Sequence, residues 1–134
     1  MSDFPTRRVA AAVIIDNGKV LATQRGHGAY KDWWEFPGGK LEAGETSEKA
    51  LVREIREELD CDIEIRGFLM TVEHDYPDFH LIMDCYLCGV DPAAVRFVEH
   101  EDARWLSYED LRSVKWLPAD GPVLALIEEQ RLLG

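Results

Sequence analysis

Residues 39–58, GKLEAGETSEKALVREIREE, contain the clearest helix signal in the chain. Thr46 is a suitable N-cap, and Glu48 stands near the positive end of the helix dipole. The pattern predicts a helix over residues 46–59, with an apolar stripe at four-residue steps that faces the core. The stripe consists of Leu51, Ile55 and Leu59.

The same helix carries Glu54, Glu57 and Glu58 at positions i, i+3 and i+4, which share one face. Like charges at this spacing repel, but their oxygens are the hard ligands that Mg²⁺ or Mn²⁺ prefers. The alternative is a solvated acidic face in an acidic protein. Gly38 and Gly39 precede the helix and would let backbone approach a ligand closely.

Arg53 directly precedes Glu54, and the helical period turns it away from the Glu54 face by about a hundred degrees. We expect it to reach back to Glu45 in a charge-assisted, bidentate pair that holds the preceding loop on the helix.

Gly39, Glu45 and the run REIREE at 53–58 together resemble the signature of the Nudix hydrolases. One position departs from that signature, because Asp60 stands where the family has a glycine that ends the helix in a left-handed conformation. Aspartate tolerates this conformation at a cost of about 1 kcal/mol. The departure concerns the helix cap and not the metal ligands.

The resemblance implies an α+β fold, an α/β/α sandwich with a mixed sheet between helices, and a pyrophosphohydrolase activity. Carried over by motif position, Glu54, Glu57 and Glu58 correspond to catalytic metal ligands, with the Gly38 or Gly39 carbonyl as an additional ligand. Glu45 and Arg53 correspond to the structural pair of the motif. In relatives a further acid often precedes a tryptophan, which makes Glu99 a catalytic candidate; the alternative is an acidic loop.

Residues 34–40, WEFPGGK, resemble the MutT-type branch, which hydrolyses nucleoside triphosphates to monophosphate and pyrophosphate. Residues 117–120, LPAD, resemble the loop that reads the base in that branch. There an asparagine recognises oxidised guanine, whereas an aspartate occurs in cytidine-nucleotide relatives. Asp120 therefore leaves CTP, dCTP, 5-methyl-dCTP and 8-oxo-dGTP open as substrates, and nucleotide-pool sanitation or housekeeping as the role. Alternatively, Asp120 is only the N-cap of the last helix.

Five further residues are considered for substrate binding. Arg25 ends the second predicted strand, where relatives place a residue near sugar or phosphate. Phe36 is a candidate wall of a base pocket, as are Tyr76 and Phe79, because aromatic faces stack on any base. Asp78 lies beside them without a specific role.

The other elements follow from turn signals and periodicity. Strands are predicted at 7–15 and 19–25, joined by the turn Asp16-Asn17-Gly18, and at 33–36, 63–72, 79–90 and 104–106. A turn is predicted at Gly38-Gly39, a short helix at 107–112 and a last helix at about 120–133. This order suggests a mixed sheet with helices on both sides, in a single domain over 1–134.

Composition limits the class of protein. The chain has 134 residues, with 15 basic and 26 acidic side chains and a net charge of −11, which argues against binding to a nucleic-acid polymer. Phosphate chemistry stays possible, because bound divalent cations reverse the local charge of an acidic site. No apolar run is long enough for a membrane span. The three cysteines predict a reducing cytoplasm and no disulfide framework, with Cys85 and Cys88 on opposite faces of one strand.

The sequence therefore predicts a Mg²⁺- or Mn²⁺-dependent enzyme, a monomer or homodimer, whose partner is a small nucleotide. Two alternatives stay open. One is a Nudix hydrolase of another nucleoside diphosphate derivative, such as a nucleotide sugar or a dinucleoside polyphosphate. The other is a non-catalytic domain that binds nucleotides.

Overall fold

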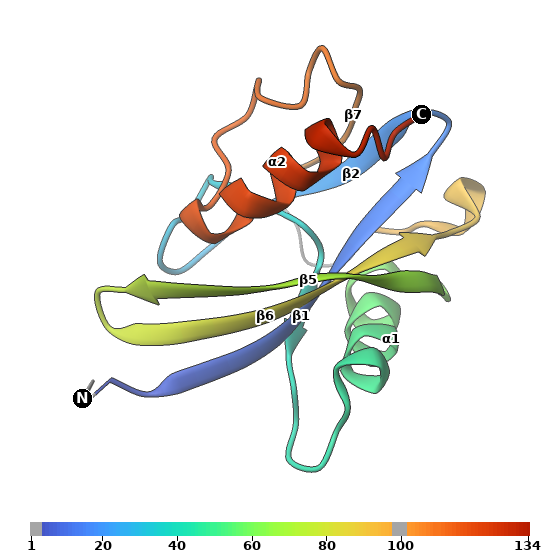
Figure 1. Ribbon diagram of the computed structural model, residues 1–134. Coiled ribbons are helices and arrows are strands. Elements are labelled where there is room, and N and C mark those ends of the chain that lie inside the picture. The colour runs from blue at the N-terminus through green and yellow to red at the C-terminus, as the bar shows by residue number, and fades with distance from the viewer. Residues whose placement is uncertain (1–3, 98–101) are drawn as a thin grey trace.

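The computed structural model describes residues 4–97 and 102–134. Figure 1 shows a twisted sheet with α1 (Ser47–Leu59) against one face and α2 (Gly121–Glu129) against the other. The predicted α/β/α sandwich with a mixed sheet is confirmed. Neither helix in the described part of the chain has the length and apolar composition that a membrane crossing requires.

The described strands are β1 (Thr6–Asp16), β2 (Lys19–Gln24), β3 (Trp34–Glu35), β4 (Gly38–Lys40), β5 (Glu64–Tyr76), β6 (Phe79–Gly89) and β7 (Asp102–Leu106). Short 3-10 turns lie at η1 (Pro92–Ala94) and η2 (Pro118–Asp120). The main sheet has the order β3-β2-β1-β6-β5, while β4 pairs with β1 and β7 pairs with β2. β1 runs parallel to β6, and the other pairs are antiparallel.

The long strand β1 organises the molecule, because both faces of it are buried. Ala10, Ala12 and Ile14 belong to the core beneath α1, whereas Ala11 and Val13 belong to the core beneath α2. This alternation follows from the two-residue period of a strand. The predicted stripe Leu51, Ile55 and Leu59 of α1 is fully buried in the first of these cores.

Two local predictions are confirmed by backbone geometry. Asn17 and Gly18 have φ of 49° and 75°, as a tight hairpin turn between β1 and β2 requires. Asp60 ends α1 in the left-handed conformation, with φ 50° and ψ 39°, and its N–H donates to the Arg56 carbonyl at 3.1 Å. Cys85 and Cys88 lie in opposite cores and, like Cys61, are free thiols.

The predicted helix at 107–112 is wrong, because these residues form turns. The Asp110 N–H donates to the Ser107 carbonyl at 3.1 Å, a three-residue bond that does not continue as an α-helix. The indole N–H of Trp116, five residues further along the chain, donates to the Leu111 carbonyl at 2.7 Å, so a side chain and not a helical N–H occupies that backbone acceptor.

The larger of the other differences from the predicted elements are the following. The last helix ends at Glu129 and not near 133, because Arg131 takes a left-handed φ of 53°. Gly38 and Gly39 belong to a strand and not only to a turn, since they pair with Ala11 and Ala10 of β1. β5 continues to Tyr76, beyond the predicted end at residue 72, because its pairing with β6 runs to the Tyr76–Phe79 turn.

Candidate functional site

The N-terminal end of α1 is fixed to the sheet by polar side chains. Thr46 caps the helix by accepting a hydrogen bond from the Lys49 N–H at 3.2 Å. The Ser47 hydroxyl donates to the Asp84 carboxylate of β6, which also accepts from Thr71 of β5 at 2.7 Å. Together with the buried stripe, these contacts set which face of α1 carries the acidic residues.

Arg53 joins the loop before α1 to the helix. Its Nε donates to Oε2 of Glu45 and its Nη2 to Oε1 of Glu45, both at 2.8 Å. Nη2 also donates to the Lys40 carbonyl of β4 at 2.9 Å. The guanidinium lowers the pKa of the Glu45 carboxyl to about 2. The structure thus places the two residues in the bidentate arrangement expected from the sequence.

Arg53 does not point away from the acidic face, so that prediction is wrong. Its Nη1 lies 2.8 Å from Oε1 of Glu54 and 3.5 Å from Oε2 of Glu57. The long side chain folds back along the helix surface, which the angular position of its Cα does not reveal. One guanidinium therefore holds the loop and also orients two carboxylates of the triplet.

The two glycines of β4 allow the sheet to approach these carboxylates. A Cβ on Gly39 would lie 2.4 Å from Cδ of Glu54, and one on Gly38 would lie 2.0 Å from the Ala10 carbonyl oxygen. The Gly38 N–H donates to Oε2 of Glu58 at 3.3 Å. Glu54 and Glu58 are therefore both held against the β4 backbone.

This set of donors fits a hard divalent cation. It consists of the carboxylates of Glu54, Glu57 and Glu58, which are oxygen ligands of the kind that Mg²⁺ takes. In residues 4–97 and 102–134 no three acidic, imidazole or thiol side chains are gathered as ion ligands. Instead, Glu54 and Glu57 face Arg53, and Glu58 accepts from Gly38. Ion binding would draw these oxygens together against their mutual repulsion.

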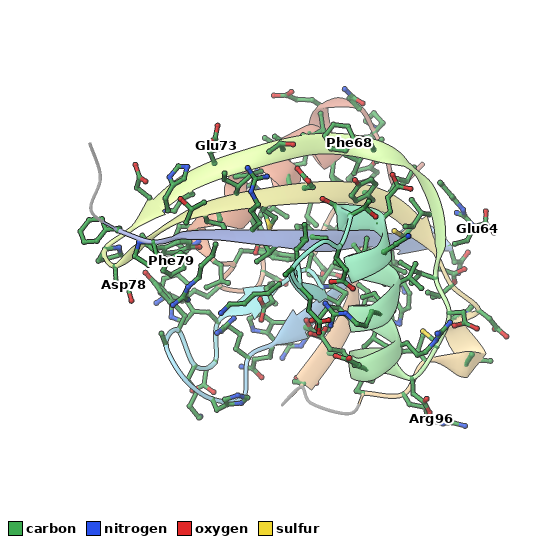
Figure 2. All side chains as sticks on the ribbon, turned by 90° about the horizontal axis from the view of Figure 1, so that it is seen from below. Glu64, Phe68, Glu73, Asp78, Phe79 and Arg96 are labelled. Carbon is green, nitrogen blue, oxygen red and sulfur yellow. The ribbon has the colours of Figure 1, made fainter. Side chains whose placement is uncertain are left out.

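A cavity of about 440 Å³ connects the end of α1 with the start of α2. Every residue that the sequence suggested for substrate binding lines this cavity, including Arg25, Phe36, Asp78 and Asp120. Two residues near the acidic face of α1, Gly38 and Glu58, line it as well. Figure 2 shows Asp78 and Phe79 at the β5–β6 turn, at the opposite end of the sheet from Glu64. Glu99 lies outside the described residues.

Asp120 is buried in this cavity, with 3% of its surface exposed. Its Oδ2 has no hydrogen-bond partner among the described residues. Burial, and then the negative charge of Glu35, raise the pKa of the Asp120 carboxyl well above its usual value. The side chain makes no capping bond to α2, and the helical φ and ψ of −82° and −12° are unlike an N-cap. The interpretation of Asp120 as only an N-cap therefore lacks its hydrogen bond.

Glu35 also lines the cavity, and sequence reasoning missed it. Burial raises the pKa of its carboxyl, and Arg25 partly opposes this effect, with Nη1 at 3.2 Å from both carboxylate oxygens. β3 pairs with β2 so that Glu35 lies opposite Thr23, close to the end of β2 where Arg25 follows. The signal in the sequence that could have identified Glu35 is Arg25, a basic residue directly after the strand that pairs with β3.

The aromatic candidates are packed against other side chains. Phe36 contacts Trp116, with ring centroids 4.6 Å apart. The Phe79 ring stacks on Tyr76 at 5.0 Å, and the Arg7 guanidinium lies 4.1 Å from its centroid. All but Trp116 line the cavity, so they form its walls while also belonging to the core.

Comparisons with known proteins identify the family and the fold. A family model described as "NUDIX domain" matches residues 6–127. The chain is 43% identical to an 8-oxo-dGTP diphosphatase of Proteus vulgaris over 89 residues, which cover 65% of this chain and 80% of that protein. It is 31% identical to a CTP pyrophosphohydrolase of Escherichia coli strain K12 over 129 residues, which cover 87% of each. Among solved structures, a MutT NUDIX hydrolase from Burkholderia pseudomallei superimposes with a TM-score of 0.76 at 28% identity, covering 92% of this chain and 96% of that one.

Proposed function

The chain belongs to the NUDIX domain family, hydrolases that act on phosphoric anhydrides of nucleotides, and on this premise we propose that it is a pyrophosphohydrolase of nucleoside triphosphates. Its products would be a nucleoside monophosphate and pyrophosphate. Its substrates would come from CTP, dCTP, 5-methyl-dCTP and 8-oxo-dGTP, in nucleotide-pool sanitation or housekeeping.

One observation carries the proposal. The carboxylate end, at Gly38 and Glu58, and the Asp120 end belong to the same 440 Å³ cavity. A nucleoside triphosphate has a polyphosphate at one end and a base at the other. It could therefore meet the acidic helix and the buried carboxyl at the same time.

The metal would be Mg²⁺, held by Glu54, Glu57 and Glu58 with the Gly38 carbonyl, because all of these ligands are hard oxygens. When bound, the ion neutralises charge on phosphate oxygens and lowers the pKa of a bound water. Arg53 would keep Glu54 and Glu57 oriented through its contacts at 2.8 Å and 3.5 Å. Glu99 is our candidate for the additional acid that accepts a proton from water.

Among the described residues, three cationic side chains line the cavity, although the whole chain carries a net charge of −11. They are Arg7, Arg25 and Lys40. Cations in a cleft attract anionic substrates and position phosphate oxygens. We propose that they contribute to binding the polyphosphate, with Arg25 held in place by Glu35.

Asp120 would read the base. A buried carboxyl oxygen without a partner is unfavourable, and an amino group of a base would supply the missing donor. The exocyclic amino group of cytosine is such a donor, and so are N1 and N2 of guanine. The relatives named for 8-oxo-dGTP and for CTP correspond to these same two kinds of base.

The test is a panel of CTP, dCTP, 5-methyl-dCTP, 8-oxo-dGTP and the unmodified nucleotides, each with Mg²⁺ and with EDTA. The proposal expects metal-dependent release of pyrophosphate and a monophosphate from at least one of them. Release of orthophosphate, or turnover restricted to nucleotide sugars or dinucleoside polyphosphates, would contradict it.

A further inference from the structure

Asp120 is held in the cavity by its backbone more than by its own side chain. Its Oδ2 has no hydrogen-bond partner among the described residues, and its side chain does not cap α2. A buried polar group without a hydrogen-bond partner is stabilised by moving toward water. The position of this carboxyl therefore depends on whatever fixes η2, the turn that carries it.

Two hydrogen bonds tie this segment to the sheet. The Leu117 N–H donates to the Trp34 carbonyl of β3 at 2.8 Å. The Ala119 N–H donates to the phenolic oxygen of Tyr76, at the end of β5, at 3.2 Å. The second bond is made by the residue directly before Asp120, so a movement at Ala119 is transmitted to the Asp120 side chain.

Tyr76 is itself firmly placed. It is 6% exposed, and its ring contacts three others, with centroids 4.6 Å from His74, 5.0 Å from Phe79 and 5.5 Å from Tyr30. Burial raises the pKa of its hydroxyl, so the group stays neutral at physiological pH. The oxygen that accepts from Ala119 is therefore held at a defined point on the cavity wall.

We propose that Tyr76 is a positioning residue for base selection, whose hydroxyl holds Ala119 and thereby keeps the Asp120 carboxyl where it meets the base. This inference rests on the proposed function and extends it, because it assigns part of the discrimination among bases to a hydroxyl on β5. The ring of Tyr76 forms part of the cavity wall, and its hydroxyl oxygen positions the Asp120 carboxyl through Ala119.

The test is the variant Tyr76→Phe, which keeps the ring contacts and removes only the acceptor oxygen. The chain offers a matched control, because the Leu133 N–H donates to the phenolic oxygen of Tyr108 at 2.9 Å, beyond the other end of α2. Tyr108→Phe removes the same kind of bond at a tyrosine that does not line the cavity. Values of kcat and KM are measured for wild type and both variants on CTP, dCTP, 5-methyl-dCTP and 8-oxo-dGTP.

We expect Tyr76→Phe to reduce the ratio of kcat/KM between the best and the worst of these nucleotides by about fivefold, the equivalent of one ordinary hydrogen bond. The loss should appear mainly in KM, and Tyr108→Phe should keep the wild-type ratio. In an Asp120→Asn background, Tyr76→Phe should change the ratio no further, because the hydroxyl acts through Asp120.

Three outcomes would overturn the inference. An unchanged kcat/KM ratio in Tyr76→Phe, or an equal loss of that ratio in Tyr108→Phe, would show that the Tyr76 hydroxyl has no specific role in base selection. A further loss in the Asp120→Asn background would show that it acts elsewhere. In each of these three outcomes the proposed function still holds, provided that the wild type cleaves the nucleotides and discriminates among them. If the wild type cleaves none of them, the proposed function and this inference both fail.

Discussion

Each acidic residue of α1 has a distinct local environment. Glu54 lies against Gly39 and Arg53, Glu58 accepts from the Gly38 N–H, and Glu57 is the most exposed of the three. Glu57 lies 3.5 Å from Arg53, farther than Glu54 at 2.8 Å, so we expect its substitution to disturb the protein less. It is therefore the cleanest position at which to test the metal role.

Glu57→Gln should lower turnover at least about a hundredfold, because an amide binds a hard dication less well than a carboxylate. The free energy of unfolding without metal should change by less than about 0.5 kcal/mol. Glu48→Gln, at an exposed position of the same helix, is the control and should keep wild-type turnover. A Glu57→Gln enzyme with wild-type kcat and wild-type Mg²⁺ dependence would refute the assigned role.

Asp120→Asn should change the order of preferred bases and also flatten the pH dependence of stability. The folded state raises the pKa of the Asp120 carboxyl above its usual 3.8, so the folded state binds more protons than the unfolded state. The free energy of unfolding of the wild type should therefore fall as pH rises from about 3.8 through the raised pKa. The asparagine variant lacks this contribution. Parallel curves for the two proteins, measured by urea denaturation across this range, would contradict the buried, proton-retaining carboxyl.

The contact between β4 and α1 is the element-scale feature on which the acidic face depends. Gly39→Ala would place a Cβ 2.4 Å from Cδ of Glu54, so the carboxylate or the strand must move. We expect the free energy of unfolding to fall by about 1–3 kcal/mol and turnover to fall with it. Gly67→Ala in β5, where a Cβ would meet nothing within 4 Å, is the matched control. Equal Mg²⁺-dependent turnover in both variants would show that close approach at Gly39 is unnecessary.

The end of α1 allows a gain in stability. Asp60 has a left-handed φ of 50°, which glycine adopts without the steric penalty of a side chain. Asp60→Gly should therefore raise the free energy of unfolding by up to about 1 kcal/mol without changing kcat, as measured by thermal and urea denaturation. Asp60→Ala, which has the penalty and no polar side chain, should be less stable than both. A glycine variant less stable than wild type would indicate that the aspartate side chain contributes to the cap.

At the scale of the whole molecule, features with a local cause were predictable from the sequence. Four-residue steps at Leu51, Ile55 and Leu59 predicted the orientation of α1, and Asp16-Asn17-Gly18 predicted the first hairpin. The resemblance supplied the sandwich architecture. The sequence also predicted the Glu45–Arg53 contact, because the long Arg53 side chain can reach back from α1 to the loop that precedes it.

Features set by distant contacts were not predictable in this way. Glu35 looks like a solvated acid until β3 places it in the cavity beside Arg25. The sequence suggested Asp120 as a cap or a base reader, and only its buried position and missing capping bond separate the two.

The central claim is that the acidic face of α1 and the Asp120 pocket serve one nucleotide. The most direct measurement is a crystal structure with Mn²⁺ and a non-hydrolysable triphosphate of the best substrate, using anomalous scattering to locate the metal. We predict manganese at Glu54, Glu57 and Glu58, with the base within hydrogen-bond distance of Asp120. Manganese at another place, or a base bound outside the cavity, would contradict the account.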